Sequence, residues 1–223
     1  KSKKELTFSV EYGILDIEKR RAEDTTMLKV ERTSVMNIDN AIRGARNPMN
    51  SWEKSDSYYD ENGKFVMGPA DLDFGHRLAV AGSDHRKFLR MIFVSMDITA
   101  PLYWWKEFDT YKVGTVANST STMHKLTSKP ITLDCFEIDD YDNSIFTNPE
   151  EIDYFIQVLE SLRLKYFATH DKRYWKELIR WLPNGWLQTR TVTMNYENLR
   201  SMYHQRENHK GCFLLPYLQR SRA

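Results

Sequence analysis

A strand that leads directly into a helix is the strongest structural signal in this sequence. Apolar and polar side chains alternate over Trp186–Met194, which is typical of a half-buried strand. Asn195 follows, and its side chain can accept a backbone N–H at the start of a helix that reaches about His209. One face of that helix carries Leu199, Met202, Tyr203 and Arg206 at the spacing i, i+3, i+4, i+7.

Arg206 is the unusual member of this helical face, because the other three residues are apolar. A guanidinium that faces a core needs an anionic partner, which is either a ligand or a carboxylate of the same chain. The side chain can also extend past the core and reach solvent. The pattern alone leaves these alternatives open.

The composition predicts one globular domain that spans residues 1–223. Of the 223 residues, 41% are hydrophobic, which is enough for a core and excludes a disordered or fibrous chain. The 32 Lys and Arg against 31 Asp and Glu leave a net charge of +1, so we expect no nucleic-acid partner and no membrane role. Cys135 and Cys212 lie far apart. Because they do not make a disulfide framework, the cytoplasm is the expected location.

Local patterns predict further elements along the chain. Alternation indicates strands over Leu6–Tyr12, Met27–Arg32 and Phe93–Ile98, the first two as a possible pair. Spacing, caps and prolines indicate helices over Ile38–Arg46, Asp71–Val80, Asp84–Met91, Pro101–Phe108, 148–167 and 172–182. The predicted N-caps are Asn37 and Asp171, and the predicted hairpin turn is Glu61–Lys64. No repeat or linker divides these elements, which agrees with a single domain.

Two segments in the middle of the chain allow both a functional and a purely structural interpretation. Gly114–Thr122 is rich in hydroxyls and poor in charge. Hydroxyls and backbone N–H groups of a loop can hold a phosphate, but the segment can equally be a solvated connection. The aromatic residues Tyr103–Trp105 could stack a flat ring, or they could belong to the core.

Several common catalytic motifs do not occur in the sequence. It contains no G-x-G-x-x-G, no G-x-x-x-x-G-K-[ST] and no G-x-S-x-G. Dinucleotide binding by a Rossmann unit, P-loop hydrolysis and serine hydrolysis therefore lose their usual markers. The six histidines make no H-E-x-x-H or other metal spacing, so no metal is expected.

Two longer segments carry a family signal. Leu182–Arg206 reads LPNGWLQTRTVTMNYENLRSMYHQR, and His85–Lys125 runs through Ala100-Pro101 and the aromatic helix. Together they resemble the flavin-dependent thymidylate synthases, whose C-terminal segment reads LP, strand, T-V-N-x-R-S-L and L-R. The second segment aligns with the family's central region without gaps. The resemblance implies a single α+β domain of thymidylate-synthase-complementing type, with a mixed, mostly antiparallel sheet flanked by helices.

The resemblance also implies roles for individual residues. Arg206 falls on the arginine that holds and polarises the uracil nucleotide, and it is the implied catalytic residue. The implied flavin-binding residues are His85, Tyr111, Lys112, Thr115 and Asn195. The implied substrate-binding residues are Glu107, Asn118, Thr120, Thr122 and Arg206.

Several charged positions of the family are changed in this chain. The signature Arg-His-Arg-x-x-Ser reads Thr110-Tyr111-Lys112-Val113-Gly114-Thr115, the nucleotide arginine becomes Thr122, and the arginine of Asn-x-Arg becomes Glu197. Threonine cannot replace a forked cation, and lysine does so only as a point charge. Each lost charged hydrogen bond costs about 1.5–3 kcal/mol. Several such losses weaken ligand binding by orders of magnitude unless other residues compensate.

The function implied by the resemblance is the reductive methylation of dUMP to dTMP, with methylene-tetrahydrofolate, FAD and NADPH. A homotetramer with active sites between subunits is implied too. The same scaffold also allows a changed pyrimidine product. The lost arginines favour an alternative, a catalytically inactive or repurposed protein that binds a nucleotide without redox chemistry. A third alternative is a structural or interaction subunit in which Arg206 pairs with a carboxylate of the same chain.

Overall fold

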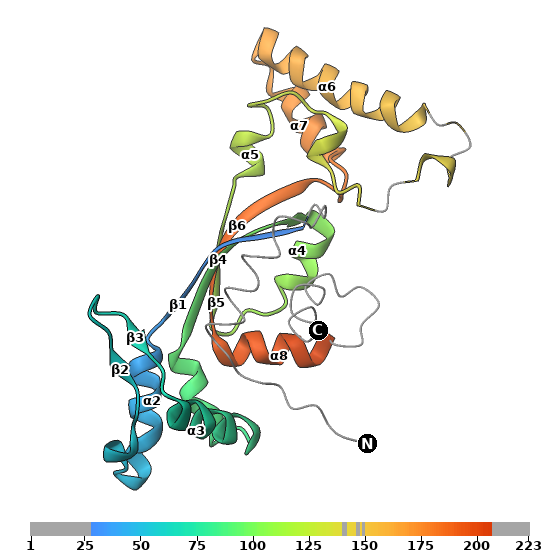
Figure 1. Ribbon diagram of the computed structural model, residues 1–223. Helices are drawn as coiled ribbons and strands as arrows, with labels where there is room; N and C mark the ends of the chain where they lie inside the picture. Colours follow the sequence, from blue (N-terminus) through green and yellow to red (C-terminus); the bar gives the residue numbers. More distant parts are fainter. Residues whose placement is uncertain (1–27, 140–141, 146–147, 149, 207–223) are drawn as a thin grey trace.

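An open, four-stranded antiparallel sheet forms the centre of the computed structural model, which describes residues 28–139, 142–145, 148 and 150–206. The strand order is β1 (Lys29–Met36), β4 (Phe93–Pro101), β6 (Leu187–Asn195) and β5 (Thr115–Ser119). Each neighbouring pair is antiparallel. Helices pack on one face and at both ends of the sheet (Figure 1). The predicted α+β class, an antiparallel sheet flanked by helices, is therefore confirmed.

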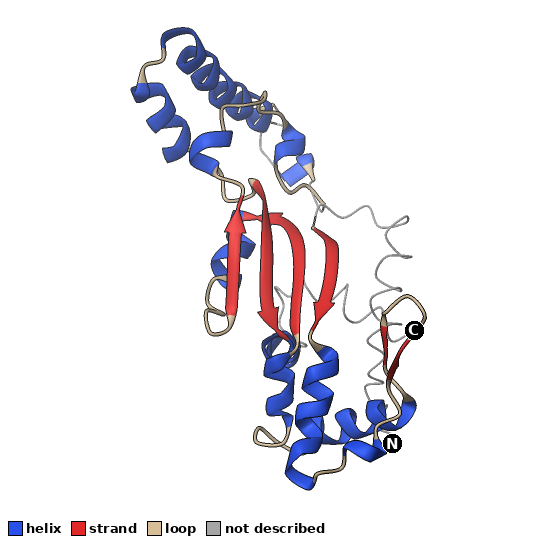
Figure 2. Ribbon diagram, turned by 90° about the vertical axis from the view of Figure 1, so that its left-hand side faces the viewer, coloured by secondary structure: helices blue, strands red, loops and turns tan. Residues whose placement is uncertain are grey.

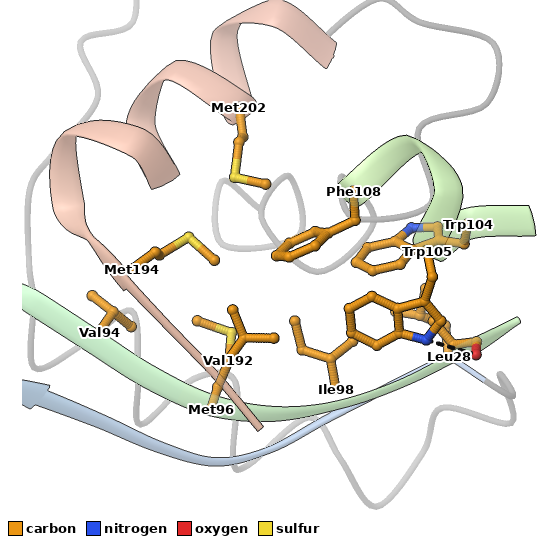
Figure 3. Packing of buried hydrophobic residues seen from close by; sticks show 11 residues of the cluster. Leu28, Val94, Met96, Ile98, Trp104, Trp105, Phe108, Val192, Met194 and Met202 are labelled. Atoms are coloured by element: carbon orange, nitrogen blue, oxygen red, sulfur yellow. Dashed lines mark hydrogen bonds between the residues drawn. The ribbon is translucent and has the colours of Figure 1, made fainter. Parts of the chain in front are cut away.

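One face of the sheet is apolar, because side chains alternate between the two faces along each strand. Alternate residues of β4 and β6 are buried there against helices α4 (Leu102–Phe108) and α8 (Tyr196–Arg206). Figure 3 shows how their side chains interlock. The core cluster includes Val94, Met96, Ile98, Trp104, Trp105, Phe108, Val192, Met194 and Met202.

The opposite face of the sheet is polar. Three side-chain pairs bond across β4 and β6, namely Ser95–Thr193 at 2.9 Å, Asp97–Thr191 at 2.6 Å and Thr99–Thr189 at 2.7 Å. These cross-strand pairs help to set the register of the two strands. Figure 2 looks onto this face, and no helix of the described part of the chain lies over it.

A helical lobe lies at one end of the sheet. Its elements are α2 (Ile38–Arg46), α3 (Pro69–Val80) and the 3-10 helices η2 (Asn47–Met49), η3 (Trp52–Lys54) and η4 (Arg86–Met91). The small hairpin β2 (Tyr58–Tyr59) and β3 (Phe65–Val66) lies beside α2 (Figure 1). The lobe has its own core cluster, made by Ala41, Ile42, Ala79, Phe88, Leu89 and Ile92.

A second helical lobe lies at the other end of the sheet (Figure 1). Its elements are α5 (Thr122–Lys125), η5 (Leu133–Cys135), η6 (Asn143–Ile145), α6 (Glu151–Thr169) and α7 (Lys172–Arg180). Its core cluster is made by Leu126, Ile131, Cys135, Phe136, Leu159, Leu178 and Trp186. None of the described helices is both long and apolar enough to cross a membrane.

Most of the predicted elements are confirmed. The strands predicted over Met27–Arg32, Phe93–Ile98 and Trp186–Met194 correspond to β1, β4 and β6. The predicted helices correspond to α2, α3, α4, α6, α7 and α8, with ends shifted by up to a few residues. The predicted turn Glu61–Lys64 joins β2 to β3. The strand predicted over Leu6–Tyr12 lies outside the described residues.

Three local predictions are wrong in detail. Asn37 precedes α2 but makes no side-chain cap, because its side-chain oxygen accepts the Asn40 side-chain amide at 2.8 Å instead of a backbone N–H. The helix predicted over Asp84–Met91 is the 3-10 helix η4, which begins only at Arg86. Pro101 ends β4 and immediately precedes α4, rather than being the first residue of that helix.

The interpretation of Gly114–Thr122 as a loop is also wrong. Residues Thr115–Ser119 form the edge strand β5, which pairs with β6 from Thr115 opposite Met194 to Ser119 opposite Arg190. Threonine is well suited to a strand, because its branched side chain packs on the pleated surface. The hydroxyls of this segment are therefore presented from a sheet edge and not from a flexible connection.

Candidate functional site

The junction of β6 with α8 forms a tight polar unit with the start of β5. The side-chain oxygen of Asn195 accepts the backbone N–H of Asn198 at 2.9 Å, which confirms the predicted cap of α8. The Asn198 amide in turn donates to the Val113 carbonyl and, at 3.2 Å, to the hydroxyl of Thr115. Two of the predicted flavin residues, Thr115 and Asn195, are therefore brought together.

Gly114 lets the chain approach this unit closely. Its φ of +67° is in the left-handed region that glycine adopts without strain. A Cβ at this position would lie 2.3 Å from the Asn195 side-chain nitrogen. The Gly114 carbonyl also accepts the Asn195 backbone N–H at 3.2 Å. A side chain at this position would force the Asn195 amide to move.

A second polar network lies at the other end of β5. The Gln188 side-chain nitrogen donates to the Thr120 carbonyl at 2.9 Å and to the Thr122 hydroxyl at 3.1 Å. The Nε of Arg190 donates to the Gln188 side-chain oxygen at 2.9 Å, and its Nη1 donates to Asp109 at 2.7 Å. Two predicted nucleotide residues, Thr120 and Thr122, are therefore tied to a guanidinium.

Sequence reasoning missed Gln188 and Arg190. The alternation of the strand could have indicated them, because Arg190 lies on the same face of β6 as the buried residues Val192 and Met194. A cation on the core-facing side of a strand needs an anionic partner or a path to solvent, as Arg206 does on its helix. Its guanidinium lies 4.2 Å from the ring centroid of Trp105, which is a cation–π arrangement.

The aromatic residues of α4 belong to the core. Trp104 stacks on Phe108 with ring centroids 5.1 Å apart, and Trp105 meets both rings edge-on. The Trp105 indole N–H donates to the carbonyls of Ala100 and Gln188, at 3.1 and 2.9 Å. Trp104 and Trp105 are thus core residues, and no face of their rings is presented to a ligand as a stacking platform.

Four charged residues meet where η4 packs against the start of α8. The carboxylate of Glu197 pairs with the Nε of Arg86 at 3.1 Å and with the Nε of Arg90 at 2.9 Å. Arg200 lies one turn further along α8 and is partly buried. The neighbouring Tyr196 is partly buried, and the desolvation of its phenol raises the pKa of Tyr196 to about 12 and keeps it neutral.

The other predicted residues are not gathered into one cluster. The two ends of β5 are about 13 Å apart, because four residue steps of about 3.3 Å separate Thr115 from Ser119. Tyr111 packs against the main core. The exposed predicted residues are His85, Glu107, Lys112, Asn118 and Thr120. Arg206 ends α8, and its side chain lies outside the described structure. The described residues contain no group of three potential metal ligands.

Comparison with known proteins identifies the fold. No family model and no curated protein match the sequence. Two solved structures of Thymidylate Synthase X (ThyX) from Helicobacter pylori, both with FAD and dUMP, match with a TM-score of 0.60 and 15% identity. They cover 86% of this chain, which in turn covers 90% and 91% of the ThyX chains. The chain has a ThyX-like fold.

Proposed function

We propose that this protein is a divergent flavin-dependent thymidylate synthase. It would convert dUMP to dTMP with methylene-tetrahydrofolate as the carbon donor, FAD as the cofactor and NADPH as the reductant. The observation that carries the proposal is the polar unit of Gly114, Thr115, Asn195 and Asn198. It joins two of the residues that the family resemblance assigns to the flavin, in a fold shared with FAD-containing and dUMP-containing structures.

The cations of the described chain are compatible with FAD and dUMP, which both carry phosphate groups. Lys112 is the one cation that the changed signature retains. Gln188, however, connects Arg190 to Thr120 and Thr122 by hydrogen bonds. A guanidinium on the neighbouring strand can therefore compensate for the arginine that Thr122 replaces. When bound, FAD would supply the hydride chemistry. Arg206 would hold and polarise the uracil ring, and Asn195 and Thr115 would position the flavin.

The proposal extends to the assembly and the cellular location. The resemblance implies a homotetramer whose active sites lie between subunits. A site between subunits would also account for predicted residues that are exposed in a single copy, such as His85 and Lys112. We propose that this assembly works in the cytoplasm.

The direct test begins with the visible absorption spectrum of the purified protein, before and after incubation with FAD and desalting. Retained flavin absorption is the expected result. The flavin-loaded protein is then given dUMP, methylene-tetrahydrofolate and NADPH, and dTMP is measured by chromatography. Failure to form dTMP under these conditions would overturn the synthase proposal.

The alternative is a protein that binds a nucleotide without redox chemistry. The observation that favours it is the set of replaced arginines, because Thr110, Thr122 and Glu197 stand at family arginine positions. Mass spectrometry of small molecules released from the purified protein distinguishes the two functions. A bound nucleotide without flavin would support the alternative. Neither ligand, together with an Arg206→Ala variant that changes only stability, would indicate a structural subunit.

A further inference from the structure

Two arginines of η4 pair with one carboxylate of α8, and a third arginine lies one turn further along α8. Glu197 uses one carboxylate oxygen for Arg86 and the other for Arg90. Arg200 is the third arginine of the group, and Arg86 and Glu197 both act on it electrostatically. Three positive charges against one negative charge leave an excess of two in this small region.

Arg200 is the least satisfied member of this group. Within the described part of the chain its guanidinium has neither a hydrogen bond nor an ion pair, although the side chain is partly buried. Burial lowers the pKa of Arg200, and the positive charge of Arg86 lowers it further. Burying a charged group that lacks a partner is unfavourable, so an added anion would stabilise the cluster.

The bonded arginines also keep donors available. Arg86 and Arg90 meet Glu197 through their Nε atoms, and their Nη groups make no hydrogen bond to another described residue. Glu197 is 17% exposed and is held by two partners, and its attraction for Arg200 is outweighed by burial and by the repulsion from Arg86. Its carboxylate orients two guanidiniums and leaves their outer edges open.

The ion pair between Arg163 and Glu160 on α6 differs from this cluster in its charge balance and in its hydrogen bonds. Arg163 bonds Glu160 through Nε at 2.7 Å and Nη2 at 2.6 Å, and its Nη1 donates to the Thr127 carbonyl. Its partner Glu160 also accepts the Ile131 backbone N–H. That pair is balanced in charge, and each nitrogen of the guanidinium makes a hydrogen bond. The cluster around Glu197 has an excess of positive charge, and several of its guanidinium nitrogens make no hydrogen bond to a described residue, as expected of a site that binds an anion.

We propose that Arg86 and Arg90, which Glu197 orients, form together with Arg200 a binding site for the phosphate group of a small molecule. Phosphate fits better than a carboxylate, because its charge near −2 matches the excess of the cluster and its oxygens accept forked guanidinium donors. The phosphate can belong to a mononucleotide, to a flavin dinucleotide or to inorganic phosphate. The site goes beyond the proposed function, since it needs no flavin chemistry to bind an anion.

The test is a calorimetric titration of the full chain with inorganic pyrophosphate. Arg200→Gln is expected to weaken pyrophosphate binding by about tenfold or more, since a charged hydrogen bond is lost. Arg77→Gln is the matched control, because Arg77 is 70% exposed and pairs with Asp73 on α3. The control is expected to bind pyrophosphate like the unmodified protein. An unmodified protein that does not bind pyrophosphate, or an Arg200→Gln variant with unchanged affinity, would overturn the proposal.

A second variant tests the site in case Arg200→Gln does not fold. Arg90 is 57% exposed, so Arg90→Gln is expected to fold and still to weaken pyrophosphate binding several-fold. Unchanged affinity in a folded Arg90→Gln variant would likewise contradict the site.

Two ligand pairs identify the source of the phosphate. The affinity ratios of FAD to riboflavin and of dUMP to deoxyuridine are measured in the unmodified protein and in the variants. The ratio that falls toward one in the variants identifies the molecule whose phosphate binds there. If pyrophosphate binding falls and both ratios stay unchanged, the site takes inorganic phosphate. These binding readouts are independent of dTMP formation, so the site and the synthase activity can fail separately.

Discussion

Arg190 and Asp109 join a central strand of the sheet to the end of the helix that covers it. The Arg190 Nη1 lies 2.7 Å from the Asp109 carboxylate, and the guanidinium lies over the ring of Trp105. The Arg190 side chain is 16% exposed, whereas Asp109 is 53% exposed. Asp109, Gln188 and the ring of Trp105 therefore hold the guanidinium in place, and its Nη2 is the one nitrogen without a hydrogen bond to a described residue.

This arrangement predicts that Arg190 contributes to nucleotide binding. Arg190→Gln is expected to weaken dUMP binding by about tenfold or more, because a charged hydrogen bond contributes about 1.5–3 kcal/mol and 1.4 kcal/mol corresponds to tenfold. Calorimetric titration with dUMP measures the change. Arg173→Gln serves as the control, since Arg173 is 88% exposed and pairs with Asp171 on the distant α7. Equal dUMP affinity in the two variants would exclude a nucleotide role for Arg190.

The second prediction concerns the glycine between β5 and α8. Gly114 and Gly63 have similar positive φ values, +67° and +74°, but only at Gly114 would an added Cβ have side-chain atoms within 4 Å. Gly63→Ala is expected to lower the free energy of unfolding by about 1–2 kcal/mol through backbone strain alone. Gly114→Ala is expected to lower it by about 1–3 kcal/mol more, because Asn195 must move. Urea unfolding followed by tryptophan fluorescence compares the two variants, and equal losses would show that the close approach is unimportant.

The elements that the sequence predicts well are those with strong local patterns. The alternation of β4 and β6 and the caps at Asp171 and Asn195 depend on neighbouring residues alone. The edge strand β5 is different, because its partner Arg190 is far along the chain from Ser119. An exposed edge strand also lacks a clear apolar alternation, so Thr115–Ser119 has the composition of a loop.

The candidate site depends even more on tertiary contacts. Thr115 and Asn195 could be named from the family resemblance, but their connection through Asn198 requires the register of β5 on β6. The cluster around Glu197 requires the packing of η4 against α8. Spacing along the chain does not predict such contacts, since Arg86 and Arg90 come from a segment that only the fold brings to Glu197.

The third prediction separates the structural role of Asn195 from its proposed binding role. Asn195→Ala removes the cap of α8 and is expected to lower the free energy of unfolding by about 1 kcal/mol. Asn195→Asp keeps an acceptor for the Asn198 N–H, so its stability is expected to stay close to that of the unmodified protein. Its added negative charge is expected to weaken FAD retention on desalting. Full FAD retention by Asn195→Asp would argue against a position of Asn195 beside the flavin.

The last prediction concerns the pH dependence of stability, which Asp71 is expected to influence strongly. This fully buried carboxylate accepts the Arg46 Nε at 2.8 Å and the Ser57 hydroxyl at 2.6 Å. Burial raises the pKa of Asp71, but hydrogen bonds from Ser55, Ser57 and Arg46 outweigh burial and hold the pKa below its ordinary value of 3.8. Its stabilising contribution is therefore fully present above about pH 3.8 and is lost as the pH falls toward the lower, folded-state pKa.

Asp71→Asn tests this contribution directly. At pH 7 the variant is expected to be less stable than the unmodified protein by about 3–5 kcal/mol, because the Arg46 charge is left buried without its partner. This difference in the free energy of unfolding is expected to become smaller when urea unfolding is repeated at pH values below 3.8, where the carboxyl of the unfolded chain is protonated. Asp73→Asn is the control, since Asp73 is 65% exposed and is expected to change stability by less than about 0.5 kcal/mol. A difference that stays constant with pH would show that Asp71 stabilises the lobe by hydrogen-bond geometry and not by its charge.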